Sequence, residues 1–113
     1  TTVLATIPWT STASGGDVIQ VKAYVIGSDI SDPSLVYSAE LMGCFSLDSD
    51  GSLTPWEIGT QVTNNISSWS GTQPDCFIEA TVNGLYIKVN GRASNTVQWL
   101  CSYSHHRLIN ITV

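Results

Sequence analysis

Apolar and polar residues alternate with a period of two along most of this chain. The clearest run places Ile19, Val21, Ala23 and Val25 on one parity, with Lys22 on the other. Successive side chains of a β-strand point to opposite faces, so this period predicts strands that each bury one face. The positions predicted to face inward are Val3, Ala5, Ile7, Ile19, Val21, Ala23, Val25, Leu35, Tyr37, Ala39, Leu41, Gly43, Phe45, Leu47, Cys76, Ile78, Ala80, Val82, Leu85, Ile87, Val89, Val97, Trp99, Cys101, Tyr103, Ile109, Ile111 and Val113.

Turn-forming residues separate these runs. A Ser/Thr/Gly-rich loop is expected over 11–16, and the Asp-Pro step within 28–33 favours a turn. Asp-Gly and Asn-Gly steps tolerate the positive φ that tight hairpins require. We therefore expect a hairpin turn at 48–51, another at 83–84 and a further turn at 90–91.

Two stretches depart from simple alternation. The run over 35–47 is long for a single strand, which predicts a bend or bulge near Gly43. A short strand over 53–58 should run back from the acidic hairpin, interrupted by Pro55. The segment 61–75 is rich in Asn, Ser and Thr, and we expect it to be the least regular part of the chain.

Seven or eight short strands with turns between them predict an all-β fold, an antiparallel β-sandwich or a jelly-roll-like variant of it. With 113 residues and an apolar fraction of 42%, the chain is large enough for one core, so residues 1–113 are expected to form a single domain. The chain does not begin with Met, which suggests a processed product or a piece of a longer protein.

The charge pattern excludes several kinds of partner. Charged residues make up only 12% of the chain, about half of the usual ~25%, a composition common in β domains outside cells or in large assemblies. The net charge is −5, with four basic residues (Lys22, Lys88, Arg92 and Arg107). So few cations argue against nucleic-acid binding and against attraction to anionic membranes. No segment has the ~20 consecutive apolar residues of a membrane helix.

The cysteine count is odd, which is unusual for a disulfide-stabilised secreted domain. We expect Cys44, Cys76 and Cys101 to pack as thiols. If a bridge exists instead, the shared inward parity of Cys76 and Cys101 makes them its partners. The spacing of the three fits no zinc motif.

Several strands also carry apolar residues on their outward parity. A lone domain rarely exposes so much contiguous apolar surface. Either loops cover these positions, or part of the outside is an oligomer interface, which the scarcity of charge favours. The outward apolar positions are Val18, Tyr24, Ile26, Val36, Met42 and Leu100.

No pattern in the sequence supports catalysis, a metal or a cofactor. The pair His105-His106 lies beside Ser104, but no nucleophile motif accompanies it, and adjacent strand residues point to opposite faces. Asp48 and Asp50 lack the further ligands of a calcium loop. We therefore expect a protein that is not an enzyme.

The tryptophans offer the best ligand-binding candidates. Trp99 shares the inward parity of its strand and is expected to be structural, whereas Trp9, Trp56 and Trp69 lie beside Pro, Ser or Gly in turn-like segments. An aromatic ring on a loop can stack on the apolar face of a sugar. The alternative is that each of these rings caps an open end of the sandwich.

The hypothesis for a binding site combines two of these rings with the acidic turn. Trp56 and Trp69, with Asp48 and Asp50, would form a shallow, solvent-facing site for a neutral surface saccharide. Each stacked ring contributes about 1 kcal/mol, so adhesion would need several copies acting together.

The C-terminal part of the chain resembles a known group of proteins. Residues 83–91 (NGLYIKVNG) followed by 96–99 (TVQW) are similar to the closing hairpin of small β domains in tailed-bacteriophage fibres and related virion proteins. The layout over 18–59, with a long alternating strand, an acidic hairpin and a short return strand, is also similar. The likeness covers about two-thirds of the chain.

The resemblance implies a virion-surface module, a tail-fibre or receptor-binding domain that folds in the host cytoplasm. Such a module would form a homotrimer, contact other virion proteins and bind a host-surface glycan. One alternative is a capsid-decoration or purely structural β domain without a ligand. Another is a carbohydrate-binding or adhesin module of a cell, which would be extracellular. The resemblance assigns no binding residue of its own.

Overall fold

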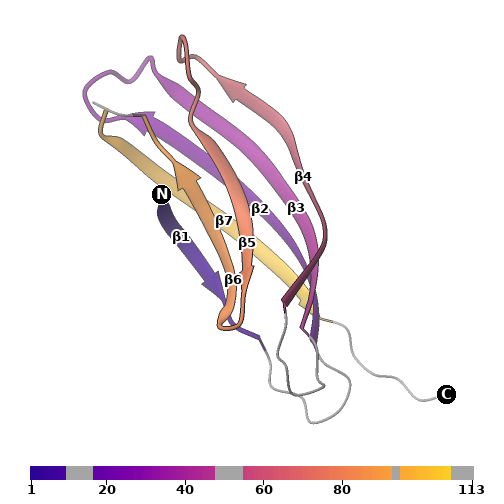
Figure 1. The fold of residues 1–113 in the computed structure, drawn as a ribbon. Coiled ribbons are helices and arrows are strands. Elements are labelled where there is room, and N and C mark those ends of the chain that lie inside the picture. Colours follow the sequence, from indigo (N-terminus) through magenta and orange to yellow (C-terminus); the bar gives the residue numbers. More distant parts are fainter. Residues whose placement is uncertain (10–16, 48–54, 93–94, 108–113) are drawn as a thin grey trace, which may run out of the picture.

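The structure is a computed structural model that describes residues 1–9, 17–47, 55–92 and 95–107 (Figure 1). These residues form strands joined by turns, and none of them is helical. The strands are β1 (Thr2–Ile7), β2 (Asp17–Asp29), β3 (Val36–Leu47), β4 (Pro55–Ser67), β5 (Asp75–Thr81), β6 (Gly84–Asn90) and β7 (Val97–Arg107).

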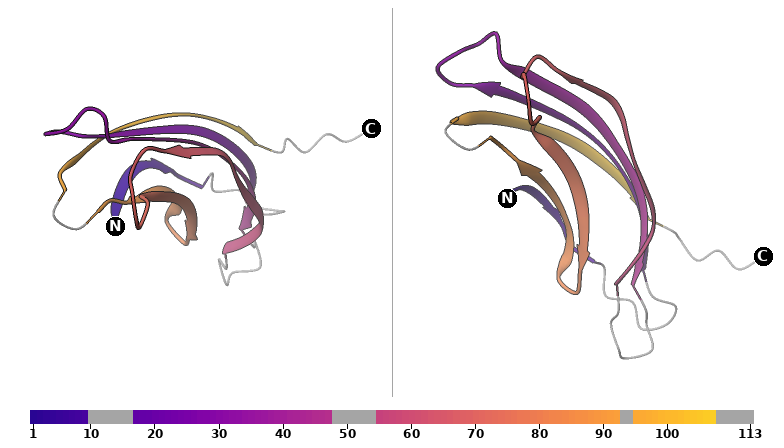
Figure 2. Two further views of the ribbon diagram at one scale, coloured as in Figure 1. Left: turned by 90° about the horizontal axis from the view of Figure 1, so that it is seen from above. Right: turned by 45° about the horizontal axis from the view of Figure 1, so that its top comes forward.

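The strands form two antiparallel sheets that face each other. One sheet has the order β1-β6-β5 and the other the order β4-β3-β2-β7. The longer, four-stranded sheet bends around the shorter one (Figure 2). The predicted antiparallel β-sandwich is therefore confirmed. The loop expected at 11–16, the turn expected at 48–51 and the strand expected around Ile109 lie outside the described residues.

The core is built from the inward parity of the central strands, as the alternation predicts. The side chains of β2 and β3 that face the smaller sheet are buried, and those of β5 and β6 meet them from the other side. These two layers of branched and aromatic side chains are the main source of hydrophobic stabilisation. The buried apolar residues are Ile7, Ile19, Val21, Ala23, Val25, Tyr37, Ala39, Leu41, Phe45, Trp69, Cys76, Ile78, Leu85, Ile87 and Val89.

Strand β4 differs from the prediction. The stretch 61–75 was expected to be irregular, but β4 continues through it to Ser67 and pairs with β3 along its length. Two register shifts each place one extra residue on β4, one opposite Cys44 and Phe45 and one beside Asn64, which has a φ of 49°. The bulges break the period of two, so the strand could not be recognised by alternation. A bulge was expected within 35–47 near Gly43, but the extra residue lies instead on the facing strand β4, opposite Cys44 and Phe45.

Pro55 begins β4 rather than interrupting it. A proline lacks the backbone N–H that a central strand needs, and it is tolerated at the first position of an edge strand. β4 lies at the edge of the four-stranded sheet, where a proline at the first position is tolerated.

A bulge also alters β1. The register with β6 shifts between Val3 and Ala5, so the inward parity changes along the strand. Ile7 is buried as predicted, whereas Val3 is exposed and Leu4 packs against the core instead. The inward prediction for Val3 is therefore wrong.

The hairpin predicted at Asn83-Gly84 is present between β5 and β6. Thr81 pairs with Gly84, so the two loop residues are Val82 and Asn83. The Thr81 hydroxyl donates to the Gly84 carbonyl over 2.9 Å, and the Asn83 N–H donates to the Thr81 hydroxyl oxygen over 3.2 Å. Val82 was expected to face inward, but at the tip of the hairpin it is exposed.

The next connection is not a hairpin. β6 belongs to the three-stranded sheet, whereas β7 pairs with β2 in the four-stranded sheet. Consecutive strands β6 and β7 therefore lie in different sheets. The hairpin that the resemblance implied for 83–91 and 96–99 is therefore wrong, because local turn chemistry cannot specify which sheet the following strand joins.

Trp99 has the structural role that its parity predicts. It lies opposite Gly27 in the β2–β7 ladder and is half-buried against the core. A Cβ on Gly27 would lie 2.6 Å from the Trp99 ring, so only glycine leaves room for it. The ring meets Tyr37 edge-to-face, with centroids 6.0 Å apart and an interplanar angle of 78°, a favourable geometry.

The buried Asp29 carboxylate ties two loops together at the end of β2. It accepts hydrogen bonds from Asn95 Nδ2 (2.6 Å), from the Ser31 N–H (2.7 Å) and from the Asp32 N–H (2.9 Å). Because these donors favour the charged form, the Asn95 bond most of all, the pKa of Asp29 lies below its usual value of 3.8.

This network predicts a pH-dependent contribution to stability. A lowered pKa in the folded state stabilises the protein above the unfolded-state pKa of 3.8 and loses that effect as pH falls through the lowered value. Asp29→Asn should therefore lower the thermal midpoint at pH 7, and its difference from wild type should shrink below about pH 4. Thermal unfolding followed by circular dichroism from pH 7 to pH 2 measures this. The control is Asp75→Asn, an exposed carboxylate. A difference that is the same at pH 7 and pH 2 would contradict the prediction.

Candidate functional site

The outer face of the four-stranded sheet carries an apolar row that crosses all four strands. The ladders place Leu100 of β7 beside Ile26 of β2, Ile26 beside Ser38 of β3, and Ser38 beside Ile66 of β4. Three of the four side chains in this row are large and apolar. Val36 lies two residues from Ser38 on the same face, and Tyr24 lies two residues from Ile26. We call Tyr24, Ile26, Val36, Ile66 and Leu100 the outer apolar patch.

All five side chains of the outer apolar patch are solvent-exposed. The exposed fraction is 64% for Leu100 and for Ile66, 49% for Ile26, 44% for Tyr24 and 41% for Val36. The sequence predicted four of the five as outward apolar positions. The alternative, that loops cover these positions, is not what the structure has.

Met42 is a further outward position and is also exposed. It pairs with Lys22 and so lies one row beyond Tyr24, on the side away from Ile26. Val18 is only half-exposed. The sequence missed Ile66, because it follows the bulge at Asn64 and no parity could be assigned to it.

The face is close to electrically neutral, although the chain has a net charge of −5. Among its described residues, the charged side chains are Lys22 and Glu40, with histidine counted as neutral. The Lys22 ammonium lies over the Tyr24 ring, 5.5 Å from its centroid. Glu40 Oε2 accepts hydrogen bonds from Asn64 Nδ2 (2.9 Å) and from the Thr63 hydroxyl (3.4 Å). Both charges lie at the border of the outer apolar patch rather than within it.

The two rings of the hypothetical saccharide site differ in their exposure to solvent. Trp56 is exposed (52%), near the start of β4. Trp69 is 6% exposed and belongs to the core. The expectation that Trp69 faces solvent is therefore wrong, and the ring packs in the interior as the alternative reading had it. Asp48 and Asp50 lie outside the described residues.

The remaining loop tryptophan is also structural. Trp9 packs against the core, and its Nε1 donates to the Thr81 carbonyl over 2.6 Å. Trp69 Nε1, by contrast, is buried and has no hydrogen-bond partner among the described residues.

The histidines and the acidic residues of the described part of the chain are not gathered into a metal site. His106 and His105 sit opposite Gln20 and Val21 of β2, on opposite faces of the sheet, as the sequence predicted. Over the described ranges, no group of three or more His, Cys, Asp or Glu side chains could hold a metal ion. Those ranges also contain no helix that could span a membrane.

The cysteines are free thiols, as expected. Cys76 is buried and lies 3.3 Å from the Tyr37 hydroxyl. Burial raises the pKa of the Cys76 thiol and that of the Cys101 thiol. Raised pKa values keep both thiols protonated and therefore poorly nucleophilic near neutral pH.

Comparison of the chain with protein-family models, with curated proteins and with solved structures found no match.

Proposed function

We propose that this domain is an assembly module, which associates with further copies of itself through the outer apolar patch. The observation that carries the proposal is the row of Leu100, Ile26 and Ile66 across the full width of the four-stranded sheet. Single exposed apolar residues are normal on a protein surface, but contiguous patches usually mark interaction sites.

The size of the patch points to association that depends on many copies. Four strands at ~4.8 Å and three rows of side chains at ~6.8 Å give a footprint of roughly 400 Å². A stable pairwise interface needs about 800 Å² on each partner. One contact of this kind is therefore weak, and it becomes effective where neighbouring contacts hold the copies at high local concentration.

A repetitive particle supplies such a concentration, and we place the module on a virion surface. The resemblance to small β domains of phage fibres and the low content of charged residues support this setting. We favour a structural or decorating role over glycan binding, because Trp69 belongs to the core and its ring is not exposed for stacking on a sugar.

The test is to weaken the patch and measure association. Replacing Ile26 and Leu100 together with threonine removes apolar surface from the middle and from one end of the row but keeps residues suited to strands. The association constant of this double variant should fall at least about tenfold, since central apolar side chains dominate interfaces. Sedimentation equilibrium from ~10 μM to ~1 mM covers the range expected for a weak contact.

The matched control replaces Val3 and Val82 with threonine. Both are exposed valines of the other sheet and its hairpin, outside the patch. This variant should associate like the wild type. A wild-type protein that stays monomeric throughout the range, or an Ile26/Leu100 variant that associates normally, would refute the proposal.

A further inference from the structure

We infer that two copies pack face to face through the outer apolar patch, about a two-fold axis that runs parallel to the strands between β2 and β3. This arrangement rests on the proposed function and specifies the partner, which is a second copy of this chain, and the pairing of residues. A two-fold axis places the same surface of both copies in contact. It sets β7 opposite the partner's β4, and β2 opposite the partner's β3.

The apolar row is complementary to itself under this operation. Leu100 at one end of the row meets the partner's Ile66, which stands at the other end, and Ile26 meets the partner's Ser38. The two most exposed members of the patch, both 64% exposed, thus cover each other twice in one dimer. The small Ser38 lets the larger Ile26 approach the facing sheet.

The charges of the face are also complementary. Lys22 and Glu40 lie on the two central strands, two residues apart along the strand direction, because Glu40 pairs with Tyr24. The two-fold axis maps β2 onto the partner's β3, so the flexible Lys22 side chain can reach the partner's Glu40. The same contact occurs twice. A chain with a net charge of −5 would otherwise repel its copy, but this face brings no excess charge into contact.

The shape of the sheet limits the contact to the neighbourhood of the row. The four-stranded sheet bends around the smaller sheet, so its outer face is convex (Figure 2). In the inferred dimer, two such faces meet near the row and diverge beyond it. Tyr24 lies one row from Ile26, and Lys22 and Met42 lie two rows from it. In the inferred dimer, these long side chains can fill the gap where the two faces diverge. The area buried in the contact is then close to that of the outer apolar patch and smaller than that of the whole sheet face. The dimer should therefore be weak.

Pairing through a sheet edge is the competing arrangement. The edge strand β4 carries Pro55 and two bulges, which are features that discourage strand addition. β7 pairs regularly with β2 and could accept a strand. Pairing through β7 would, however, leave the row of Leu100 and Ile26 exposed to solvent. It would also place the partner's exposed row next to it, in the same extended sheet. Face-to-face packing buries the row instead.

The experiment exchanges the charges of the face. Lys22→Glu places two carboxylates at each cross-dimer contact, and Glu40→Lys places two ammonium groups there, so each variant alone should dimerise at least about tenfold more weakly than wild type. In an equimolar mixture, each contact joins one Glu to one Lys. Mixed dimers should therefore exceed the statistical half of all dimers when counted by native mass spectrometry.

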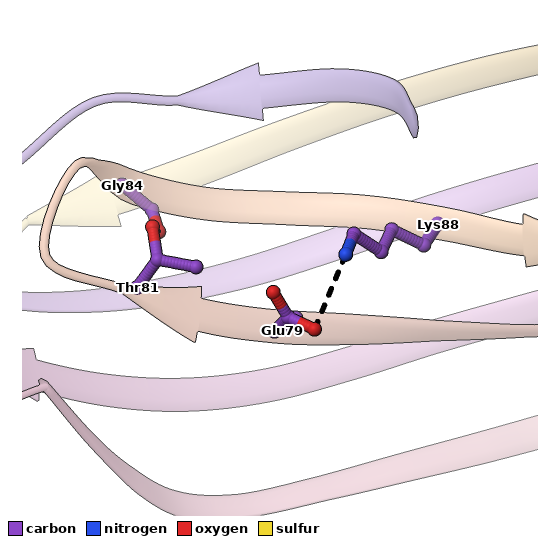
Figure 3. Close-up of polar contacts among 4 residues, drawn as sticks. All are labelled: Glu79, Thr81, Gly84 and Lys88. Atoms are coloured by element: carbon purple, nitrogen blue, oxygen red, sulfur yellow. Dashed lines mark hydrogen bonds and ion pairs between the residues drawn. The ribbon is translucent and has the colours of Figure 1, made fainter. Parts of the chain in front are cut away.

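The outer face of the smaller sheet provides a matched control pair. Lys88 Nζ lies 3.2 Å from Glu79 Oε2 there (Figure 3). Lys88→Glu and Glu79→Lys change the net charge of the chain by the same amounts as the two test variants. Both controls should dimerise like the wild type and mix statistically. Circular dichroism confirms that each variant is folded.

The outcomes separate the arrangement from the proposed function. A wild-type dimer whose test variants weaken and then recover on mixing supports the two-fold packing. The two-fold packing is overturned if association depends on Ile26 and Leu100 but produces trimers, or if it is unchanged by the substitutions at Lys22 and Glu40. In that case the proposed assembly function still stands. If association is unchanged by the substitutions at Ile26 and Leu100, the two-fold packing and the proposed assembly function are both overturned.

Discussion

Replacing Phe45 with alanine is expected to lower the free energy of unfolding by about 3–5 kcal/mol, because a large buried ring is removed and the cavity collapses only in part. Phe45 is fully buried (0% exposed), between Ile19 on β2 and Glu57 on β4 in the ladders. Its ring also covers Gly43, where a Cβ would lie 2.6 Å from Phe45 Cε2. Because Gly43 has no side chain, this position cannot fill the cavity that removal of the ring would leave.

The measurement is urea unfolding at low protein concentration, followed by tryptophan fluorescence. Since domains of this size have a total stability of about 5–15 kcal/mol, the variant should unfold at a far lower urea concentration. Val82→Ala is the control, because Val82 is an exposed hairpin residue and its loss should change stability by less than about 0.5 kcal/mol. A loss below about 1 kcal/mol for Phe45→Ala would mean that the ring is not part of a tightly packed core.

Gly84→Ala should be nearly as harmful, although it adds only one methyl group. Gly84 has a φ of +147°, a conformation that costs other residues about 1–3 kcal/mol. A Cβ at this position would also lie 2.6 Å from the backbone oxygen of Ile7 at the end of β1. The backbone cannot move away without breaking the ladder between β1 and β6, so the strain and the clash add.

The expected destabilisation is at least about 2 kcal/mol in urea unfolding. Gly59→Ala is the matched control. A Cβ on Gly59 has no atom within 4 Å, so this variant should keep nearly all of its stability. Equal stability of the two alanine variants would show that the hairpin relaxes freely and that Gly84 is not required where β1 meets β6.

The sequence by itself determined the strands whose pattern is local. β2 and β3 alternate without a bulge in their mutual ladder, so every second residue from Ile19 to Val25 and from Tyr37 to Phe45 could be assigned to the core. The β5–β6 hairpin was marked in the same way by Asn83-Gly84. In each case the signal comes from neighbouring residues, because side-chain direction and turn geometry depend on neighbours alone.

The candidate site could be predicted only in part. Tyr24, Val36 and Leu100 were identifiable as apolar residues on the outward parity of their strands. That they form one patch was not, because a pattern within a strand says nothing about its register with the next. Ile66 was missed for a related reason: the bulge at Asn64 shifts its parity, and a bulge is stabilised by the ladder with β3 rather than by the local sequence.

Only the tertiary structure decided which strands meet and what each tryptophan does. β7 crosses to the four-stranded sheet after β6, and this choice brings Leu100 beside Ile26, residues that lie 74 positions apart in the chain. Trp69 and Trp56 both follow turn-like sequences, yet one fills the core and the other faces solvent. Burial depends on what the rest of the chain places over a residue, so contacts distant in sequence determine it and local composition does not.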